Sequence, residues 1–244
     1  AIESRPQVMR NTLFLNRGDN TYAEIAQLSG LEASEWSWSL AFLDVDLDGF
    51  EDLLVTTGHL HDLLDADTAT RNQDLIRPRR QSLRRRTLLN FPPLRTPKLA
   101  FRNRGDLTFE ETGRAWGFDT SGISHGMAFA DLDNDGDLDV VINNLRSEAG
   151  IYRNDTIAPR VAVRLKGKPP NTRGIGARIL ATGGPMAQSQ EVISGGRYLS
   201  GDDPSRVFAT GSLTNQLVIE ILWRSGARSF GPGVRANRIC EIDE

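Results

Sequence analysis

The sequence predicts an all-β protein, on three observations: an internal repeat, short apolar runs separated by turn signals, and two aspartate-rich loops of one design. The loops read DVDLDGFED at residues 44–52 and DLDNDGDLD at residues 131–139. They start 87 residues apart, and the same offset aligns NRGDNTY at residues 16–22 with NRGDLTF at residues 103–109. Strand-turn-strand units that recur at a fixed spacing are typical of repeated β architectures.

Each repeat contains the same elements in the same order. In the first repeat, a short strand over residues 13–15 precedes a turn at residues 17–20, where glycine and Asx residues suit a hairpin. The return strand covers residues 21–25, and a further strand at residues 40–43 leads into the aspartate loop. A strand at residues 53–57 leaves it. Units of this kind predict the blades of a β-propeller.

Both loops offer oxygen ligands for a metal ion. Carboxylates stand at loop positions 1, 3, 5 and 9, glycine stands at position 6, and the main-chain carbonyl at position 7 adds another oxygen. Hard oxygen donors in this number suit Ca2+. The predicted ligands are Asp44, Asp46, Asp48, the Phe50 carbonyl and Asp52 in the first loop, and Asp131, Asp133, Asp135, the Asp137 carbonyl and Asp139 in the second.

Two alternatives to this metal site fit the pattern less well. An EF-hand requires a bidentate Glu at position 12 and flanking helices, but position 12 is Val55 in one loop and Ile142 in the other. A surface turn that merely favours Asp and Gly would leave four carboxylates repelling one another, in two separate loops. The sequence therefore predicts two Ca2+ sites at strand-strand corners.

An insertion separates the two repeats, at about residues 59–98. It has few β-branched residues and predicts one or two short helices, broken by Pro78 and ended by Pro92-Pro93. Its basic cluster consists of Arg77, Arg79, Arg80, Arg84, Arg85 and Arg86. The cluster is either an anion site or, as is usual for charge runs, a solvated helix face. Nucleic acid is not expected, since no aromatic residues are interleaved with these arginines.

The C-terminal part of the chain predicts a second, smaller β domain. Residues 161–165 and 217–223 alternate between apolar and polar side chains, and glycine-containing turns separate the strands. Short strands at regular spacing favour a small antiparallel sandwich or barrel. The predicted domains are residues 1–158, with two blades and the helical insertion, and residues 159–244, with the boundary at Ala158-Pro159.

These motifs carry a family resemblance. Five segments resemble the FG-GAP/VCBS repeats of β-propellers, which include calcium-loop blades. These segments are LFLNRGDNTY, AFLDVDLDGFEDLLV, AFRNRGDLTF, MAFADLDNDGDLDVVINN and IYRN. An ASPIC/UnbV domain is resembled by three further segments, RGIGAR at residues 173–178, GRYLS at residues 196–200 and WRSG at residues 223–226. The combination is similar to the cartilage-acidic-protein-like family. It departs from that family's pattern at FATG (residues 208–211) and at Arg224. The resemblance implies a partial propeller and a secreted protein.

Composition agrees with an exported β protein. The formal charge is −3, and no apolar run is long enough to span a membrane. Cys240, the single cysteine, excludes an internal disulfide, and its apolar surroundings predict a buried, inert thiol. The three histidines form no transition-metal set: His59 and His61 are interpreted as loop residues, and His125 as a packing residue. No catalytic constellation is evident.

The function expected from the sequence is therefore a calcium-binding extracellular scaffold or adhesion-type binding protein. The alternative is a carbohydrate-active or other enzyme built on a VCBS propeller, and activity is left open. The expected partner is a protein or glycan, at an extracellular, cell-surface or periplasmic location. Because a propeller closes with about four to eight blades, two blades predict that further blades or another subunit complete the structure.

Overall fold

The computed structural model of the chain describes residues 10–73 and 87–244. Strands hold 42% of the residues and helices 6%, so the prediction of an all-β protein is confirmed. Most strands pair antiparallel, in several small sheets, and the described residues form no closed barrel. The chain divides into two compact units. The first comprises Ala1–Trp38 and Val55–Ser124, and the second comprises Ser39–Leu54 and His125–Glu244.

Both predicted hairpins are present in the first unit, and they have the same turn. The first joins β1 (Phe14–Asn16) to β2 (Tyr22–Glu24), and the second joins β6 (Leu99–Asn103) to β7 (Phe109–Glu111). In the first turn, Asn16 Oδ1 accepts a hydrogen bond from Gly18 N at 2.8 Å and Asp19 Oδ1 accepts one from Thr21 N at 3.0 Å. The second turn repeats these bonds at 2.9 and 3.0 Å, in the pairs Asn103–Gly105 and Asp106–Thr108.

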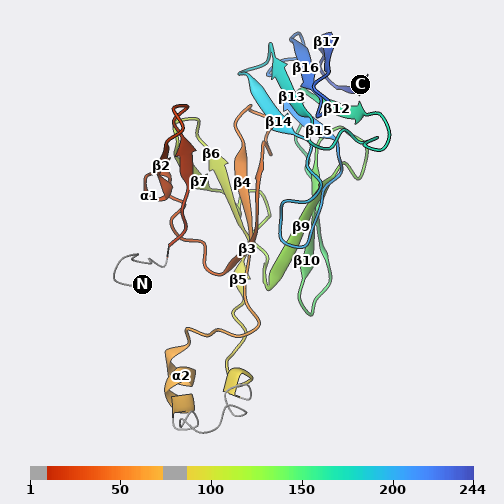
Figure 1. The fold of residues 1–244 in the computed structure, drawn as a ribbon. Helices are drawn as coiled ribbons and strands as arrows, with labels where there is room; N and C mark the ends of the chain where they lie inside the picture. Colours follow the sequence, from red (N-terminus) through yellow and green to blue (C-terminus); the bar gives the residue numbers. More distant parts are fainter. Residues whose placement is uncertain (1–9, 74–86) are drawn as a thin grey trace. The chain divides into compact units, whose positions relative to one another are not determined.

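A four-stranded sheet takes two strands from each repeat. Its order is β3-β4-β6-β7, with β3 (Ser37–Leu43) and β4 (Asp52–Thr57) on either side of the first aspartate loop (Figure 1). All residues of β4 are buried. One blade is thus built from the loop strands of one repeat and the hairpin of the next.

The second aspartate loop has the same setting. It connects β9 (Ser124–Ala130) to β10 (Asp139–Asn144), and β11 (Gly150–Tyr152) pairs with β10 in a sheet of order β11-β10-β9. The shorter β5 (Thr96–Pro97) and β8 (Ser121–Gly122) form a two-stranded ladder in the first unit. Helix α1 (Ala26–Ser29), which the sequence did not predict, follows β2 and ends at Gly30 with φ of 74°.

The insertion between the repeats contains α2 (Ala66–Gln73), as the sequence predicted. Asp65 Oδ1 accepts a hydrogen bond from Thr68 N at 2.7 Å at the start of this helix. The two ends of the insertion meet where His59 N and Leu94 N each donate to the other residue's main-chain oxygen at 2.9 Å. The arginine cluster at residues 77–86 lies outside the described residues.

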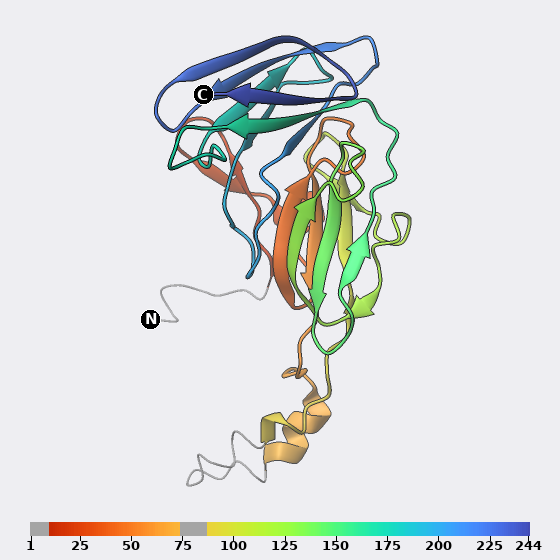
Figure 2. The ribbon, with the colours of Figure 1, turned by 90° about the vertical axis from the view of Figure 1, so that its right-hand side faces the viewer.

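The strands of the predicted C-terminal domain form two sheets. One has the order β15-β12-β18, with β12 (Arg160–Lys166), β15 (Arg206–Ala209) and β18 (Arg238–Asp243). The other has the order β14-β13-β16-β17, with β13 (Arg178–Thr182), β14 (Gln188–Glu191), β16 (Gln216–Leu222) and β17 (Arg228–Arg235). The expectation of a wholly antiparallel domain is wrong at one pair: β12 and β18 run parallel, side by side in Figure 2.

The core of this domain follows the alternation seen in the sequence. Inward positions of β12, β13 and β16 are fully buried, including Val163, Ile179 and Ile219. Phe208 and Trp223 fill the same cluster, to which Cys240 adds a partly buried side chain. Burial raises the pKa of the Cys240 thiol above its ordinary value, which keeps it protonated.

Candidate metal centre

The first aspartate loop is held in a tight turn by its own carboxylates. Asp44 Oδ1 accepts a hydrogen bond from Asp48 N at 3.0 Å, and Asp44 Oδ2 accepts one from Gly49 N at 2.9 Å. Asp52 Oδ2 accepts one from Val45 N at 2.9 Å, which ties the ninth position back to the second. Gly49 has φ of 103°, a conformation that favours glycine, and this explains the residue at position 6.

The second loop repeats these bonds one by one. Asp131 accepts from Asp135 N and from Gly136 N, both at 3.1 Å, and Asp139 Oδ2 accepts from Leu132 N at 2.8 Å. Gly136 has φ of 92°. The two loops therefore share one backbone geometry, as the sequence repeat predicted.

The shared geometry gathers carboxylate oxygens at each loop. The oxygens of Asp44, Asp46 and Asp48 lie within 4.8 Å of one another. In the second loop the gathered residues are Asp131, Asp133 and Asp139, within the same limit. Three charged oxygen donors at this spacing fit a hard cation such as Ca2+. The residues present thus fit the predicted ion at both loops.

The remaining predicted ligands have other contacts in the described structure. Asp52 is fully buried and accepts the hydrogen bond from Val45 N, and Asp135 and Asp137 both contact Arg160. The roles of the Phe50 and Asp137 carbonyl oxygens as ligands stay predictions.

Electrostatics at both loops disfavour an isolated cluster of charged carboxylates. Burial, the largest cause, raises the pKa of Asp44 to about 8. The bond from Gly49 N lowers it, while the neighbouring carboxylates of the loop raise it. Burial also raises the pKa of Asp137 to about 7, against the lowering effect of Arg160. A bound divalent cation reverses this balance, because it stabilises the charged form of every carboxylate near it.

A single residue bridges the two loops within the second unit. Asn154 N donates to Asp139 Oδ1 at 2.9 Å, and its side-chain Nδ2 donates to the Val45 main-chain oxygen at 2.9 Å. The sequence reading did not identify Asn154 as a site residue. A signal was present, because the IYRN segment at residues 151–154 is the start of a further repeat, in which Asn154 is the counterpart of Asn16 and Asn103.

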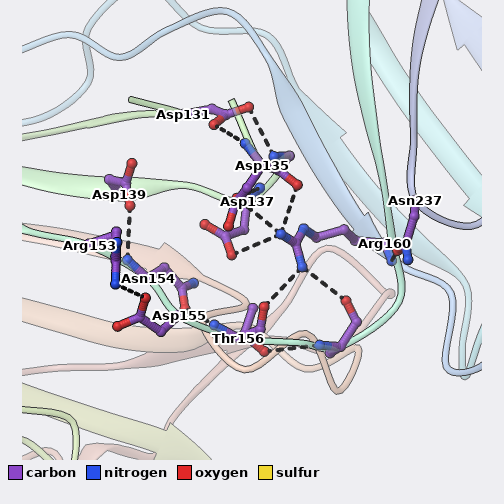
Figure 3. A network of polar contacts seen from close by, with 12 residues as sticks. Asp131, Asp135, Asp137, Asp139, Arg153, Asn154, Asp155, Thr156, Arg160 and Asn237 are labelled. Atoms are coloured by element: carbon purple, nitrogen blue, oxygen red, sulfur yellow. Dashed lines mark hydrogen bonds and ion pairs between the residues drawn. The ribbon is translucent and has the colours of Figure 1, made fainter. Parts of the chain in front are cut away.

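Arg160 joins the second loop to the C-terminal domain. Its Nη2 donates to the Asp135 main-chain oxygen at 2.8 Å and lies 3.0 Å from Asp135 Oδ1 and 3.3 Å from Asp137 Oδ2 (Figure 3). Its Nη1 donates to the main-chain oxygens of Thr156 and Ala158, at 3.0 and 3.3 Å. Arg160 is the first residue of β12, so the same residue begins the first strand of the C-terminal sheets.

A cavity of about 250 Å3 lies in the second unit. Its charged wall includes Arg197, which is ion-paired with Asp202 and lies over the Phe129 ring at 4.4 Å from the ring centroid. Asp202 Oδ1 also accepts a hydrogen bond from Phe129 N at 3.0 Å. Burial lowers the pKa of Arg206, another lining residue. Apolar Phe42 and Leu138 complete a wall that is part aromatic and part charged.

Two of the three histidines make ring contacts with aromatic residues, His125 in agreement with the packing role expected for it. The His59 ring stacks on Trp38, with 5.9 Å between centroids and 5° between planes, and also contacts Trp36. The His125 ring contacts Tyr198 edge-on at 5.8 Å.

No helix in the described part of the chain has the length and apolar character needed to cross a membrane.

Two protein-family models match the chain. The model of an FG-GAP-like repeat matches residues 5–55 and 96–142, and each matched stretch contains one aspartate loop. The model named ASPIC and UnbV matches residues 167–244. No curated protein matches the chain.

Proposed function

The chain belongs to the FG-GAP repeat proteins that carry an ASPIC/UnbV domain, and from this premise we propose that it is a calcium-stabilised binding protein of the surface or adhesion type. The narrower cartilage-acidic-protein-like assignment is part of the proposal. The observation that carries it is the pair of carboxylate clusters, Asp44-Asp46-Asp48 and Asp131-Asp133-Asp139, each at the corner of a matched repeat.

The proposed role of the ion is structural. Bound Ca2+ supplies positive charge that offsets the mutual repulsion of the loop carboxylates. The chain's own residues do the rest: Asp44 and Asp131 hold the turn, Gly49 permits it, and Asn154 joins the loops. Each loop connects two neighbouring strands of a blade, so the ion stabilises a corner with little apolar core of its own.

An extracellular, cell-surface or periplasmic location follows from the same proposal. Extracellular calcium modules work with dissociation constants of about 10⁻⁴–10⁻³ M, which suits a structural ion outside the cell. The single cysteine leaves the chain without an internal disulfide, so bound calcium takes over the stabilising role that disulfides have in many exported proteins.

Calcium titration of the chain by calorimetry tests the proposal. We expect two sites, one of which is lost in Asp46→Asn and the other in Asp133→Asn. Asp155→Asn is the matched control, because Asp155 is an exposed acid outside both loops that pairs with Arg153. Thermal unfolding should show a stabilisation of about 2.7 kcal/mol for each site at a hundredfold excess of Ca2+ over that site's dissociation constant. A melting curve that a chelator leaves unchanged rejects the proposal.

A further FG-GAP-type repeat is the partner that we propose for the first hairpin. The second hairpin, β6–β7, lies beside β4, and its Phe101 is 7% exposed. The counterpart of Phe101 is Phe14, in a hairpin that pairs with no other strand of the described residues, and it is 60% exposed. The missing neighbour is therefore a strand of the β4 kind, apolar and preceded by an aspartate loop.

The expected partners are a protein or a glycan, and the lining of the cavity in the second unit favours a glycan as its ligand. Sugars present both hydroxyl groups and an apolar ring face, and the wall supplies both complements: Arg197 and Asp202 for hydroxyl groups, and the exposed Phe42 for a ring. Screening the chain on a glycan array, with product analysis of any bound glycan, separates binding from hydrolysis. The Arg197→Ala variant should lose array binding if the cavity is responsible.

A further inference from the structure

We propose that Arg160 is a built-in cation of the second aspartate loop, so that the two loops hold Ca2+ with unequal affinity and the first loop holds it more tightly. The inference rests on the calcium function proposed above and adds what distinguishes the two loops. It is carried by the position of one guanidinium group.

Arg160 is fixed in place at both its guanidinium and its main chain. On one side its Nη2 contacts Asp135 and Asp137 of the loop, at 2.8–3.3 Å (Figure 3). On the other side its main chain is held by Asn237: Asn237 N donates to Arg160 O at 2.6 Å, and Arg160 N donates to Asn237 Oδ1 at 3.3 Å. The Arg160 side chain is 10% exposed, so its charge is poorly screened by solvent.

The two loops differ at the residues that this cation touches. In the first loop, the position-5 carboxylate of Asp48 is one of the three gathered oxygens. In the second loop, the position-5 carboxylate of Asp135 lies at Arg160, and the gathered set contains Asp139 instead. Position 7 also differs, because the first loop has Phe50 where the second has the buried Asp137. The acid at position 7 is the one that gives Arg160 a second partner.

Two physical effects then weaken Ca2+ binding at the second loop. The guanidinium repels a divalent cation placed a few ångströms away, and it holds Asp135, which would otherwise be a ligand. Charge interactions at this distance, even with strong screening, correspond to affinity changes of roughly tenfold or more. When calcium is scarce, the positive charge of Arg160 still balances part of the negative charge of the second loop. The loop also stays attached to β12 through Arg160.

The experiment measures each loop separately by calcium calorimetry. The Asp46→Asn chain reports the second loop, and the Asp133→Asn chain reports the first. We expect the first loop to bind at least about tenfold more tightly. Adding Arg160→Gln to the Asp46→Asn chain should tighten the second loop by a similar factor. Arg153→Gln is the matched control, because it removes a nearby positive charge that is exposed and paired only with Asp155 among the described residues.

The outcomes separate this inference from the calcium function. No binding at either loop rejects the calcium function, and the inference with it. Binding at both loops with equal affinity rejects the inference alone. Tightening by Arg160→Gln no greater than that by Arg153→Gln also rejects it. Should the Arg160→Gln chain fail to fold, the comparison of Asp46→Asn with Asp133→Asn still decides.

Discussion

Asn154 donates from its side-chain Nδ2 to the main-chain oxygen of Val45, 2.9 Å away, and so connects the two aspartate loops. Val45 is the second residue of the first loop. The main-chain nitrogen of Asn154 meanwhile donates to Asp139, the last acid of the second loop, at 2.9 Å. Loops that are far apart in the sequence are thereby joined through one residue, which contacts the first loop by its side chain and the second by its main chain.

Replacing Asn154 by alanine should destabilise the chain by about 1–2 kcal/mol, because Val45 O loses its donor in a partly buried setting. The measurement is urea unfolding in saturating Ca2+. Asn16→Ala is the matched control: Asn16 holds the equivalent turn in an exposed hairpin, where its side chain accepts the bond from Gly18 N. An effect of equal size in the two variants would show that the bridge adds nothing.

The local features of the fold were predictable from the sequence. The hairpin turns follow from residues such as Asn16 and Asp19, whose side chains accept hydrogen bonds from main-chain nitrogens two residues later. The loop geometry follows from alternate aspartates and one glycine with positive φ. These signals are contained within a few residues, so their meaning does not depend on the rest of the chain.

The features that the sequence did not predict depend on residues far apart. Asn154 and Val45 are separated by 109 positions, and Arg160 and Asp135 by 25. The parallel pairing of β12 with β18 likewise joins the two ends of the C-terminal domain. The complete burial of β4 on both faces also depends on distant residues, because it arises from the strands beside it. The neighbouring elements decide which face of a strand is buried.

Gly58→Ala should destabilise the first unit by about 2–4 kcal/mol. Gly58 has φ of 105°, and a Cβ there would lie 2.5 Å from the Gly122 main-chain oxygen and 2.9 Å from Ile123 Cα. Main-chain atoms cannot rotate away as a side chain can. Gly18→Ala is the control, because Gly18 has φ of 80° with no atom within 4 Å, so only backbone strain of about 1 kcal/mol remains. Equal midpoints in denaturant for the two variants would contradict the steric argument.

The Cys240 thiol should react slowly with an alkylating reagent in the folded chain and rapidly in denaturant. Burial raises its pKa in the folded state, so the reactive thiolate is scarcer there than in the unfolded chain. By linkage, the contribution of this group to stability is complete below the unfolded pKa and decreases as the pH rises above it. Labelling rates followed by mass spectrometry from pH 7 to 10 measure this. Native and denatured rates that coincide would contradict it.

The exposed first hairpin should make the isolated chain associate. Phe14 and Tyr22 are 60% and 61% exposed, whereas Phe101, in the equivalent of Phe14, is 7% exposed under its neighbouring strand. Covering apolar surface is worth about 25 cal/mol per Å2, and a strand edge adds main-chain hydrogen bonds to that gain. Sedimentation velocity over a range of concentrations should therefore show dimers or larger species.

A paired substitution distinguishes this hairpin from other exposed apolar residues. Phe14→Ser with Tyr22→Ser should shift the chain towards monomer, because both residues lie on the hairpin that pairs with no further strand in the described part of the chain. Leu199→Ser with Leu213→Ser is the matched control, since these side chains are 88% and 69% exposed but belong to the C-terminal domain. Association that survives the first pair and is lost with the second would place the contact elsewhere. A soluble monomer with a cooperative melt at every concentration would show that the hairpin is stable as it stands, and the proposed further repeat would then be unnecessary.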